Sequence, residues 1–225
     1  YSPERVFVGI CQQNKHSKEN CLPNNFKWKK NIRTVDKSYK EAKGPTYARY
    51  ICSTLFKNED YFLQIDSHSH FVKDWDVKCI QMMKDLENEQ SIKNKKVLLS
   101  HYPPDEDSYH KNQSDRYVTH MVDCFFNHEG ILTFHGAKWK TPEKLPRRNA
   151  FIAGGFFFSP GAFIKEVPFD PHLDYLFTGE EILFSARAFT HGWDVYTPNR
   201  NIVYHAYIRK KEPDRKSTRL NSSHT

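Results

Sequence analysis

The chain has 225 residues, of which 38% are hydrophobic and 15% aromatic, and it carries a formal net charge of +7. This composition supplies enough apolar surface for a sizeable core and excludes an intrinsically disordered chain. The basic residues are scattered and do not alternate with aromatic residues, which argues against a nucleic-acid-binding platform.

The five cysteines are an odd number and include no Cys-x-x-Cys pair. This pattern indicates neither a disulfide framework nor a structural zinc site. No apolar run reaches the ~18 residues that a membrane-spanning helix needs. Together with the unpaired cysteines, this favours a cytoplasmic protein. The alternative is a protein of the Golgi lumen whose N-terminal anchor precedes Tyr1.

Short apolar runs and helical spacing alternate along the chain. Apolar runs predict strands over Arg5–Ile10, Tyr61–Ile65, Val97–Tyr102, Ile131–Phe134, Phe151–Phe158, Val195–Tyr196 and Ile202–Tyr207. Spacings of three and four predict helices over Ala48–Leu55, with Pro45 in the first turn, Trp75–Leu86 and Glu180–Thr190. The order of these elements predicts an α/β domain with a mixed sheet.

Polar, aperiodic stretches predict a long loop with short pieces of structure over Cys11–Lys43 and an exposed loop over Pro103–Ser114. Ser159 followed by Pro160 has the pattern of a helix N-terminus, with a capping side chain before a proline.

The clearest chemical signal is Asp66-Ser67-His68, at the end of the Tyr61–Ile65 strand. Ligands of open α/β sheets bind beyond the carboxyl ends of strands. A spacing of two in extended chain places Asp66 and His68 on the same side, and their oxygen and nitrogen atoms suit a divalent ion such as Mn²⁺. The alternative is a turn in which Asp66 accepts backbone hydrogen bonds.

A convincing metal site needs a third ligand, for which His205, inside an apolar stretch, is a candidate. A lone buried histidine is more often a hydrogen-bonded structural residue. Composition alone does not choose between His205 and the other histidines that lie near predicted strand or helix ends, which are His70, His101, His135 and His191.

Six segments between Glu4 and Lys210 resemble, in order and spacing, the polypeptide α-N-acetylglucosaminyltransferase family. They are ERVFVGICQQN, AKGPTYAR, YFLQIDSHSHFVKDWD, FIAGGFFFSPGAF, FTGEEILFSARAFTHGWDVYTP and IVYHAYIRK. The same layout is less closely similar to the mucin-type GalNAc-transferases. The resemblance implies a GT-A fold with a mixed central sheet, and transfer of GlcNAc from UDP-GlcNAc to a hydroxyproline, serine or threonine hydroxyl of a protein, with retention of configuration.

The resemblance also implies roles for individual residues. It implies Asp66, His68 and His205 as ligands of Mn²⁺ or another divalent cation, Arg49, Asp66, Gly154 and Gly155 as donor-binding residues, and Glu180 and Glu181 as catalytic residues at the sugar or acceptor. Each has a plainer alternative: a surface ion pair for Arg49, a strand bulge for the glycines, and a favourable helix-dipole interaction for the two glutamates.

Relative to this family, we expect residues 1–213 to form a partial catalytic domain, truncated at both ends and lacking the first strand–helix unit that holds part of the uridine pocket. Residues 214–225 are polar and aperiodic, and we expect a disordered or non-native tail that resembles translated sequencing-adapter text. A sugar-binding pseudoenzyme and a metal-dependent hydrolase remain as alternatives. The expected partners are UDP-GlcNAc and a protein acceptor, without nucleic acid or a membrane segment.

Overall fold

The computed structural model describes residues 3–16, 20–23, 25–92, 95–107, 117–140 and 143–207. The chain forms two compact units. Unit 1 takes its described residues from 1–59 and 168–177, and unit 2 from 60–167 and 178–213. Residues 214–225, where we expect a tail, lie outside the described residues. Among the described helices, none has the length and apolar character to cross a membrane.

Unit 1 is built on a parallel pair of strands, β1 (Val8–Asn14) and β2 (Ile32–Ser38), and on helix α1 (Pro45–Ser53). The expected proline in the first turn of α1 is confirmed: Pro45 follows Gly44, whose φ of 90° suits glycine. Single 3₁₀ turns lie at Pro3–Arg5, Lys29–Asn31 and Tyr39–Glu41.

The prediction of a loop over Cys11–Lys43 is wrong, because β1 continues to Asn14 and β2 lies within the stretch. The apolar run over Arg5–Ile10 predicts only the start of β1, because the end of β1 and most of β2 are polar. Their pairing runs in unbroken register from Val8 opposite Ile32 to Asn14 opposite Ser38. It is reinforced by a 2.7 Å hydrogen bond that Gln12 Nε2 donates to Asp36 Oδ1.

Unit 2 contains a five-stranded sheet in the order β3-β9-β5-β10-β8. These strands are β3 (Tyr61–Ile65), β9 (Phe156–Pro160), β5 (Lys96–Ser100), β10 (Trp193–Thr197) and β8 (Arg147–Asn149). The β5–β10 pair is parallel and the other three pairs are antiparallel. The expected mixed sheet is therefore confirmed.

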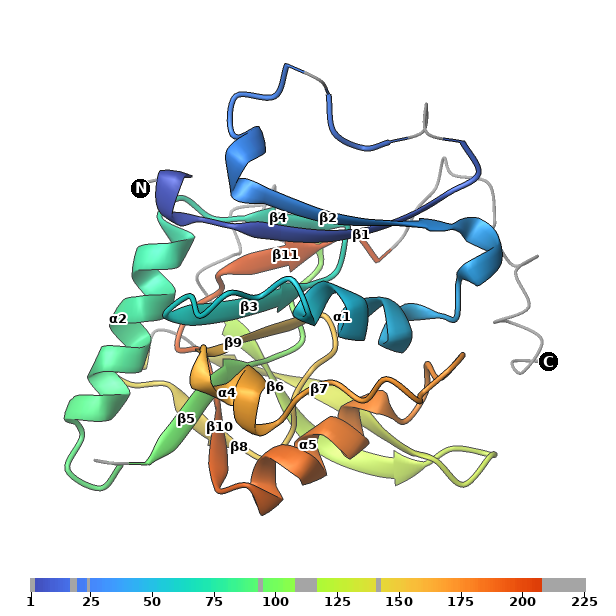
Figure 1. Ribbon diagram of the computed structural model, residues 1–225. Coiled ribbons are helices and arrows are strands. Elements are labelled where there is room, and N and C mark those ends of the chain that lie inside the picture. The colour runs from blue at the N-terminus through green and yellow to red at the C-terminus, as the bar shows by residue number, and fades with distance from the viewer. Residues whose placement is uncertain are drawn as a thin grey trace. The chain divides into compact units, whose positions relative to one another are not determined.

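Strand β9 supplies core residues to both faces of this sheet, because successive side chains of a strand point to opposite sides. Phe156 and Phe158 pack with helix α2 (Trp75–Asn88) in the main core cluster. Phe157 contacts Phe163 of α4 (Ala162–Glu166) and Phe184 of α5 (Glu180–Thr190), at ring-centroid distances of 5.7 and 5.6 Å. Figure 1 shows these helices around the sheet.

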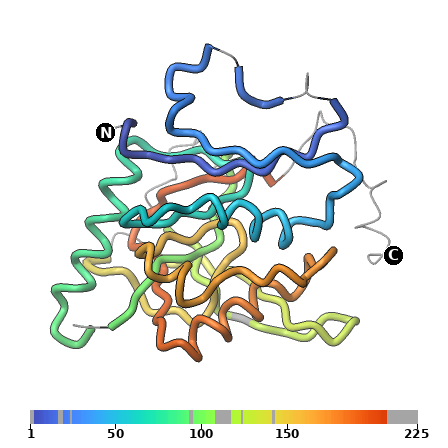
Figure 2. Tube along the Cα trace, viewed as in Figure 1, coloured from blue at the N-terminus to red at the C-terminus, as the bar shows by residue number. Residues whose placement is uncertain are grey.

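Two further antiparallel pairs complete unit 2. One joins β4 (Ser69–Phe71) to β11 (Val203–His205), segments far apart in sequence that run side by side in the trace of Figure 2. The other joins β6 (Tyr117–Phe126) to β7 (Leu132–Lys140).

Three expectations for unit 2 need correction. Ser159 does not begin a helix: it pairs with Phe62 inside β9, and α4 begins after Gly161 with no side-chain cap. The strand expected over Phe151–Phe158 begins only at Phe156. Strand β6 was not expected, and β7 extends well beyond Phe134. Polar residues interrupt the apolar residues of both strands, so neither is one continuous apolar run.

His101 is an unusual member of this core. It follows β5, is fully buried, and presents its ring edge-on to Phe156 at 5.1 Å. Within the described part of the chain neither ring nitrogen has a hydrogen-bond partner. Burial in these surroundings disfavours the charged imidazolium and lowers the pKa of His101 from 6.5 to about 3.

His101 should therefore make the stability of the protein depend on pH. Below pH 6.5 the unfolded chain binds a proton at this residue that the folded chain does not bind until about pH 3. The free energy of unfolding should fall as the pH falls through this window, by at most about 1.4 kcal/mol per pH unit from this group. Urea denaturation of His101→Gln between pH 4 and 7 should show a correspondingly flatter dependence, whereas replacement of the exposed His172 should leave the slope unchanged. An unaltered slope in His101→Gln would rule out this assignment.

Candidate functional site

The candidate site begins where β3 ends. The Asp66 backbone N–H donates to the Gly155 carbonyl at 3.3 Å, and the Asp66 carbonyl accepts a 2.7 Å hydrogen bond from Ser69 Oγ. These bonds fix the main chain on both sides of the residue. The Asp66 side chain is 40% exposed, so a ligand can reach the carboxylate while hydrogen bonds hold the main chain of the residue.

His205 reaches Asp66 through main-chain pairing. In the β4–β11 register His205 lies opposite Ser69, and its N–H donates to the Pro104 carbonyl at 3.0 Å. The next residue, Ala206, donates to the carbonyl of His68 at 3.0 Å. As a result His205 Nε2 lies 3.8 Å from Asp66 Oδ2, with the imidazole only 13% exposed.

His68 lies beside this pair without joining it. Its Nδ1 is 3.0 Å from Ser67 Oγ, and its ring stands edge-on to that of His205 with centroids 6.2 Å apart. In the ranges that the structure describes, no three His, Cys, Asp or Glu side chains form a group that can hold a metal ion. The structure thus brings Asp66 and His205 together and leaves His68 as a neighbour.

The other candidate histidines have different surroundings. His70 forms an exposed ion pair with Glu106 at 3.0 Å, and His101 is buried in the core. His191 Nδ1 lies 2.7 Å from the Arg187 carbonyl at the end of α5. His135 lines a separate pocket, described below.

Gly154 and Gly155 form the turn before β9. A Cβ atom on Gly155 would lie 3.2 Å from Asp66 Oδ2, so the absence of a side chain keeps the space beside this carboxylate open. Gly154 is held from two sides: its carbonyl accepts a 2.7 Å hydrogen bond from Gln64 Nε2, and its N–H donates to Glu181 Oε1 at 2.7 Å.

The remaining predicted residues lie on two helices. Glu180 and Glu181 form the first turn of α5 and both are partly buried. Glu181 contacts the glycine turn through the hydrogen bond to Gly154. Arg49 lies on α1 in unit 1, partly buried, whereas all the other predicted site residues belong to unit 2.

Two tyrosines in the site were not anticipated. Tyr102 donates from its hydroxyl to Glu181 Oε2 at 2.5 Å, and Tyr207 donates to the Pro103 carbonyl at 2.7 Å. Although the Tyr207 ring is largely exposed, enclosure of its hydroxyl raises its pKa to about 12, with help from the negative charges of Asp66, Asp105 and Glu181. In the sequence, both stand only as the last residues of predicted strands, over Val97–Tyr102 and Ile202–Tyr207.

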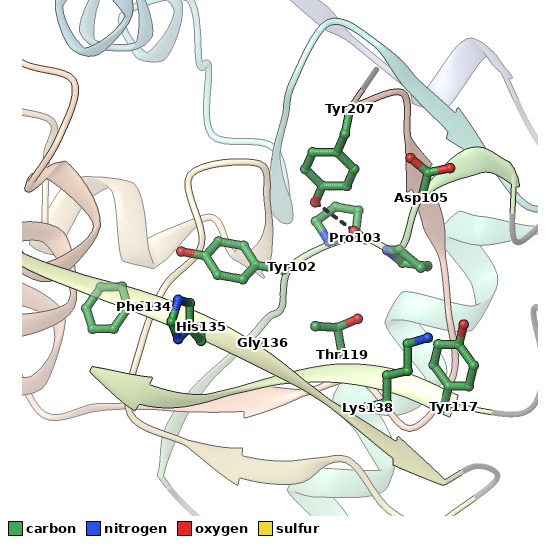
Figure 3. Close-up of a pocket in the computed structure, with 11 residues that line it drawn as sticks. Tyr102, Pro103, Asp105, Tyr117, Thr119, Phe134, His135, Gly136, Lys138 and Tyr207 are labelled. Atoms are coloured by element: carbon green, nitrogen blue, oxygen red, sulfur yellow. Dashed lines mark hydrogen bonds between the residues drawn. The ribbon is translucent and has the colours of Figure 1, made fainter. Parts of the chain in front are cut away.

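A pocket of about 460 Å³ opens next to these tyrosines (Figure 3). Tyr207 and Asp105 lie on one side, and Thr119, Lys138 and Tyr117 of the β6–β7 pair lie on the other. Asp105 also forms a backbone bridge with His205, which links the pocket wall to the Asp66–His205 pair. The complete lining is Tyr102, Pro103, Pro104, Asp105, Tyr117, Thr119, Phe134, His135, Gly136, Lys138 and Tyr207.

The Asp66–His205 pair fits a divalent cation. Ligand distances to such ions are about 2.0–2.2 Å for both carboxylate oxygen and imidazole nitrogen. Two donor atoms 3.8 Å apart are therefore close enough to contact one ion. A hard oxygen together with an imidazole nitrogen is a donor set that Mn²⁺ accepts.

Comparison with known proteins identifies the family. The glycosyltransferase (GlcNAc) family matches residues 23–220 of the chain. The chain belongs to this family. A comparison with curated protein sequences gives no match.

A crystal structure of GalNAc-T7 with UDP, GalNAc and Mn²⁺ is similar in fold to this glycosyltransferase domain, with a TM-score of 0.59 at 16% sequence identity. The match covers 90% of this chain but only 38% of GalNAc-T7. The expected GT-A fold is confirmed, and so is the expected membership of a glycosyltransferase family. The narrower family of hydroxyproline, serine or threonine GlcNAc-transferases stays a prediction.

The pocket wall yields a test of side-chain packing between β6 and β7. A Cβ atom on Gly136 would overlap with the Cγ2 methyl group of Thr119, so the Thr119 side chain or the backbone of one strand must shift. Gly136→Ala should therefore lower the free energy of unfolding by about 1–3 kcal/mol, the usual cost of overpacking.

Thr119→Ser provides the matched control, because serine keeps the hydroxyl and lacks the clashing methyl group. In the Thr119→Ser background, Gly136→Ala should lose most of its effect in urea denaturation. The packing argument fails if the alanine costs the same stability in both backgrounds.

Proposed function

We propose that the protein transfers GlcNAc from UDP-GlcNAc to a protein hydroxyl, on hydroxyproline, serine or threonine, with retention of configuration. The observation that carries the proposal is the juxtaposition of Asp66 and His205, 3.8 Å apart and beside the side-chain-free Gly155, in a chain of the GlcNAc glycosyltransferase family. GalNAc-T7 was crystallised with UDP and Mn²⁺, which supports a nucleotide-sugar donor and a divalent ion for this chain too.

In this proposal Asp66 and His205 hold the divalent ion, and His68 completes the site after its ring turns away from Ser67. When bound, the ion supplies Lewis-acid stabilisation of the departing diphosphate. The Gly154–Gly155 turn lets the donor approach the main chain closely beside Asp66. Arg49 on α1, whose planar guanidinium suits a phosphate or uracil edge, stays a prediction as a donor-binding residue.

Glu181 is proposed to contact the sugar. Both of its oxygens already accept a hydrogen bond, from Gly154 N–H and from the Tyr102 hydroxyl. Since each carboxylate oxygen has two acceptor sites, capacity remains for a sugar hydroxyl. Glu180, the first residue of α5, is proposed to share this acidic edge of the donor site.

The engagement of Glu181 favours front-face transfer over a covalent glycosyl-enzyme. In front-face transfer the acceptor oxygen bonds to the anomeric carbon as the bond to UDP breaks, and the hydroxyl proton passes to the departing phosphate. The retained configuration then follows without a carboxylate nucleophile. We propose that the acceptor hydroxyl approaches from the pocket lined by Tyr102 and Tyr207.

The decisive experiment measures UDP release from UDP-GlcNAc with hydroxyproline, serine or threonine peptides, with and without Mn²⁺. Transfer should require both metal and peptide, and NMR of the product should show an α linkage. A sugar-binding pseudoenzyme would bind UDP-GlcNAc without releasing UDP. A hydrolase would be active on substrates that carry no nucleotide.

Removal of the Asp66 carboxylate should abolish metal-dependent donor binding. In calorimetry, wild-type protein should bind UDP at least about 10-fold more tightly with Mn²⁺ than without, and Asp66→Ala should lose most of this difference because one metal ligand is missing. Asp85→Ala is the matched control, since Asp85 lies on α2, where it accepts a hydrogen bond from Gln81. Equal UDP affinity with and without metal in the wild-type protein would refute the metal assignment.

A further inference from the structure

The Tyr102 side chain contacts both the pocket and the Glu181 carboxylate beside the glycine turn. Its ring packs with Met121, Phe134 and Ala153 in a small core cluster and also lines the 460 Å³ pocket. Its hydroxyl leaves this apolar contact and donates to Glu181 Oε2 at 2.5 Å. Core packing thus holds the Tyr102 ring in place, and the hydrogen bond to Glu181 fixes the orientation of its hydroxyl.

The hydrogen bonds continue from Glu181 to the residues around Asp66. Glu181 Oε1 accepts from Gly154 N–H, and Gly154 in turn accepts from Gln64 Nε2 of β3. The neighbouring Gly155 carbonyl accepts from the backbone of Asp66. One continuous series of contacts therefore runs from the Tyr102 hydroxyl through Glu181 and the glycine turn to the Asp66 main chain.

Tyr102 is suited to act as a permanent donor in this series. Burial, together with the adjacent negative charge of Glu181, raises the pKa of Tyr102 above its usual value of 10. The phenol therefore stays protonated throughout the neutral range. A hydrogen bond from a neutral donor to a carboxylate is shorter and stronger than one between neutral groups, so it restricts Glu181 to one orientation.

We propose that Tyr102 is a positioning residue for sugar transfer. Its hydroxyl fixes the Glu181 carboxylate, and through it holds the Gly154–Gly155 turn against Asp66. The role in transfer rests on the proposed function, whereas the fixing of the turn is a property of the protein without donor or metal.

The test replaces the hydroxyl and keeps the ring. In Tyr102→Phe, amide hydrogen exchange at Gly154 and Gly155 should accelerate by about 10-fold in metal-free protein, the effect of losing one hydrogen bond to a charged group. The urea transition should stay cooperative and shift only by the loss of this one hydrogen bond, because the core contacts of the ring remain. With donor, metal and peptide, kcat should fall by about 10-fold while KM for UDP-GlcNAc stays within about twofold.

Two further variants distinguish a specific effect of the Tyr102 hydroxyl on the glycine turn from a general increase in the flexibility of the domain. Tyr61→Phe removes a hydroxyl at the start of β3, where the ring stacks on Phe158, and should leave exchange at the glycine turn unchanged. In Glu181→Ala the link to Gly154 is already gone, so adding Tyr102→Phe should not accelerate the exchange further. Additive effects of the two substitutions, or a Tyr102→Phe protein that exchanges like wild type, would overturn the proposal.

The exchange measurement also separates this proposal from the proposed function. If the wild-type protein releases no UDP, the proposed function fails, and exchange still decides whether Tyr102 holds the glycine turn. If UDP is released and kcat is unaffected by Tyr102→Phe, the positioning role fails and the glycosyltransferase proposal stands.

Discussion

The short β4–β11 pairing is the constraint on which the candidate site depends. Asp66 comes from the first third of the chain and His205 from the last third, and nothing local brings them together. The bonds from His205 N–H to Pro104 and from Ala206 N–H to His68 set their separation. Because the register of a strand decides which face each side chain occupies, a slip of one residue would turn His205 away from Asp66. The metal-binding chemistry proposed here is therefore specified by backbone hydrogen bonds.

The five-stranded sheet fixes the position of the glycine turn, Gly154–Gly155, beside Asp66. Strand β9 is anchored through Phe156 and Phe158 to the α2 core and through Phe157 to the aromatic cluster with α4 and α5. The glycine turn immediately before β9 therefore has a rigid support. Its position beside Asp66 follows from the β3–β9 register, in which Ile65 lies opposite Phe156. Helix α5 packs on β9 through Phe184 and places Glu181 at the glycine turn, where it accepts a hydrogen bond from Gly154. The packing of the core therefore also positions the residues of the site.

The sequence was most informative where one element carries the whole signal. The bounds of β3 and α5, and the proline in the first turn of α1, could be predicted from apolar runs and helix-end residues. Strand β2 could not, since it is mostly polar and its partner β1 lies well before it in the sequence. Strand β6 pairs with β7 across a short connection, but polar residues interrupt its apolar ones. The sequence identified Asp66, His68 and His205 as residue types suited to binding a metal. The short distance between His205 and Asp66, and the orientation of His68 toward Ser67, depend on contacts between distant segments and are seen only in the structure. The sequence did not indicate a role for Tyr102 because its hydrogen-bond partner, Glu181, is distant in sequence.

The charge around the site bears on how a nucleotide-sugar can be bound. The chain is basic overall, with a net charge of +7, yet the groups whose charge reaches Tyr207 are the carboxylates of Asp66, Asp105 and Glu181. A diphosphate that approached these carboxylates without a counter-ion would meet like charges, and such repulsion grows as water is excluded. A divalent cation between Asp66 and His205 reverses the sign of this interaction, because its charge is the largest in such a site. The carboxylates around the site therefore make metal binding and donor binding interdependent.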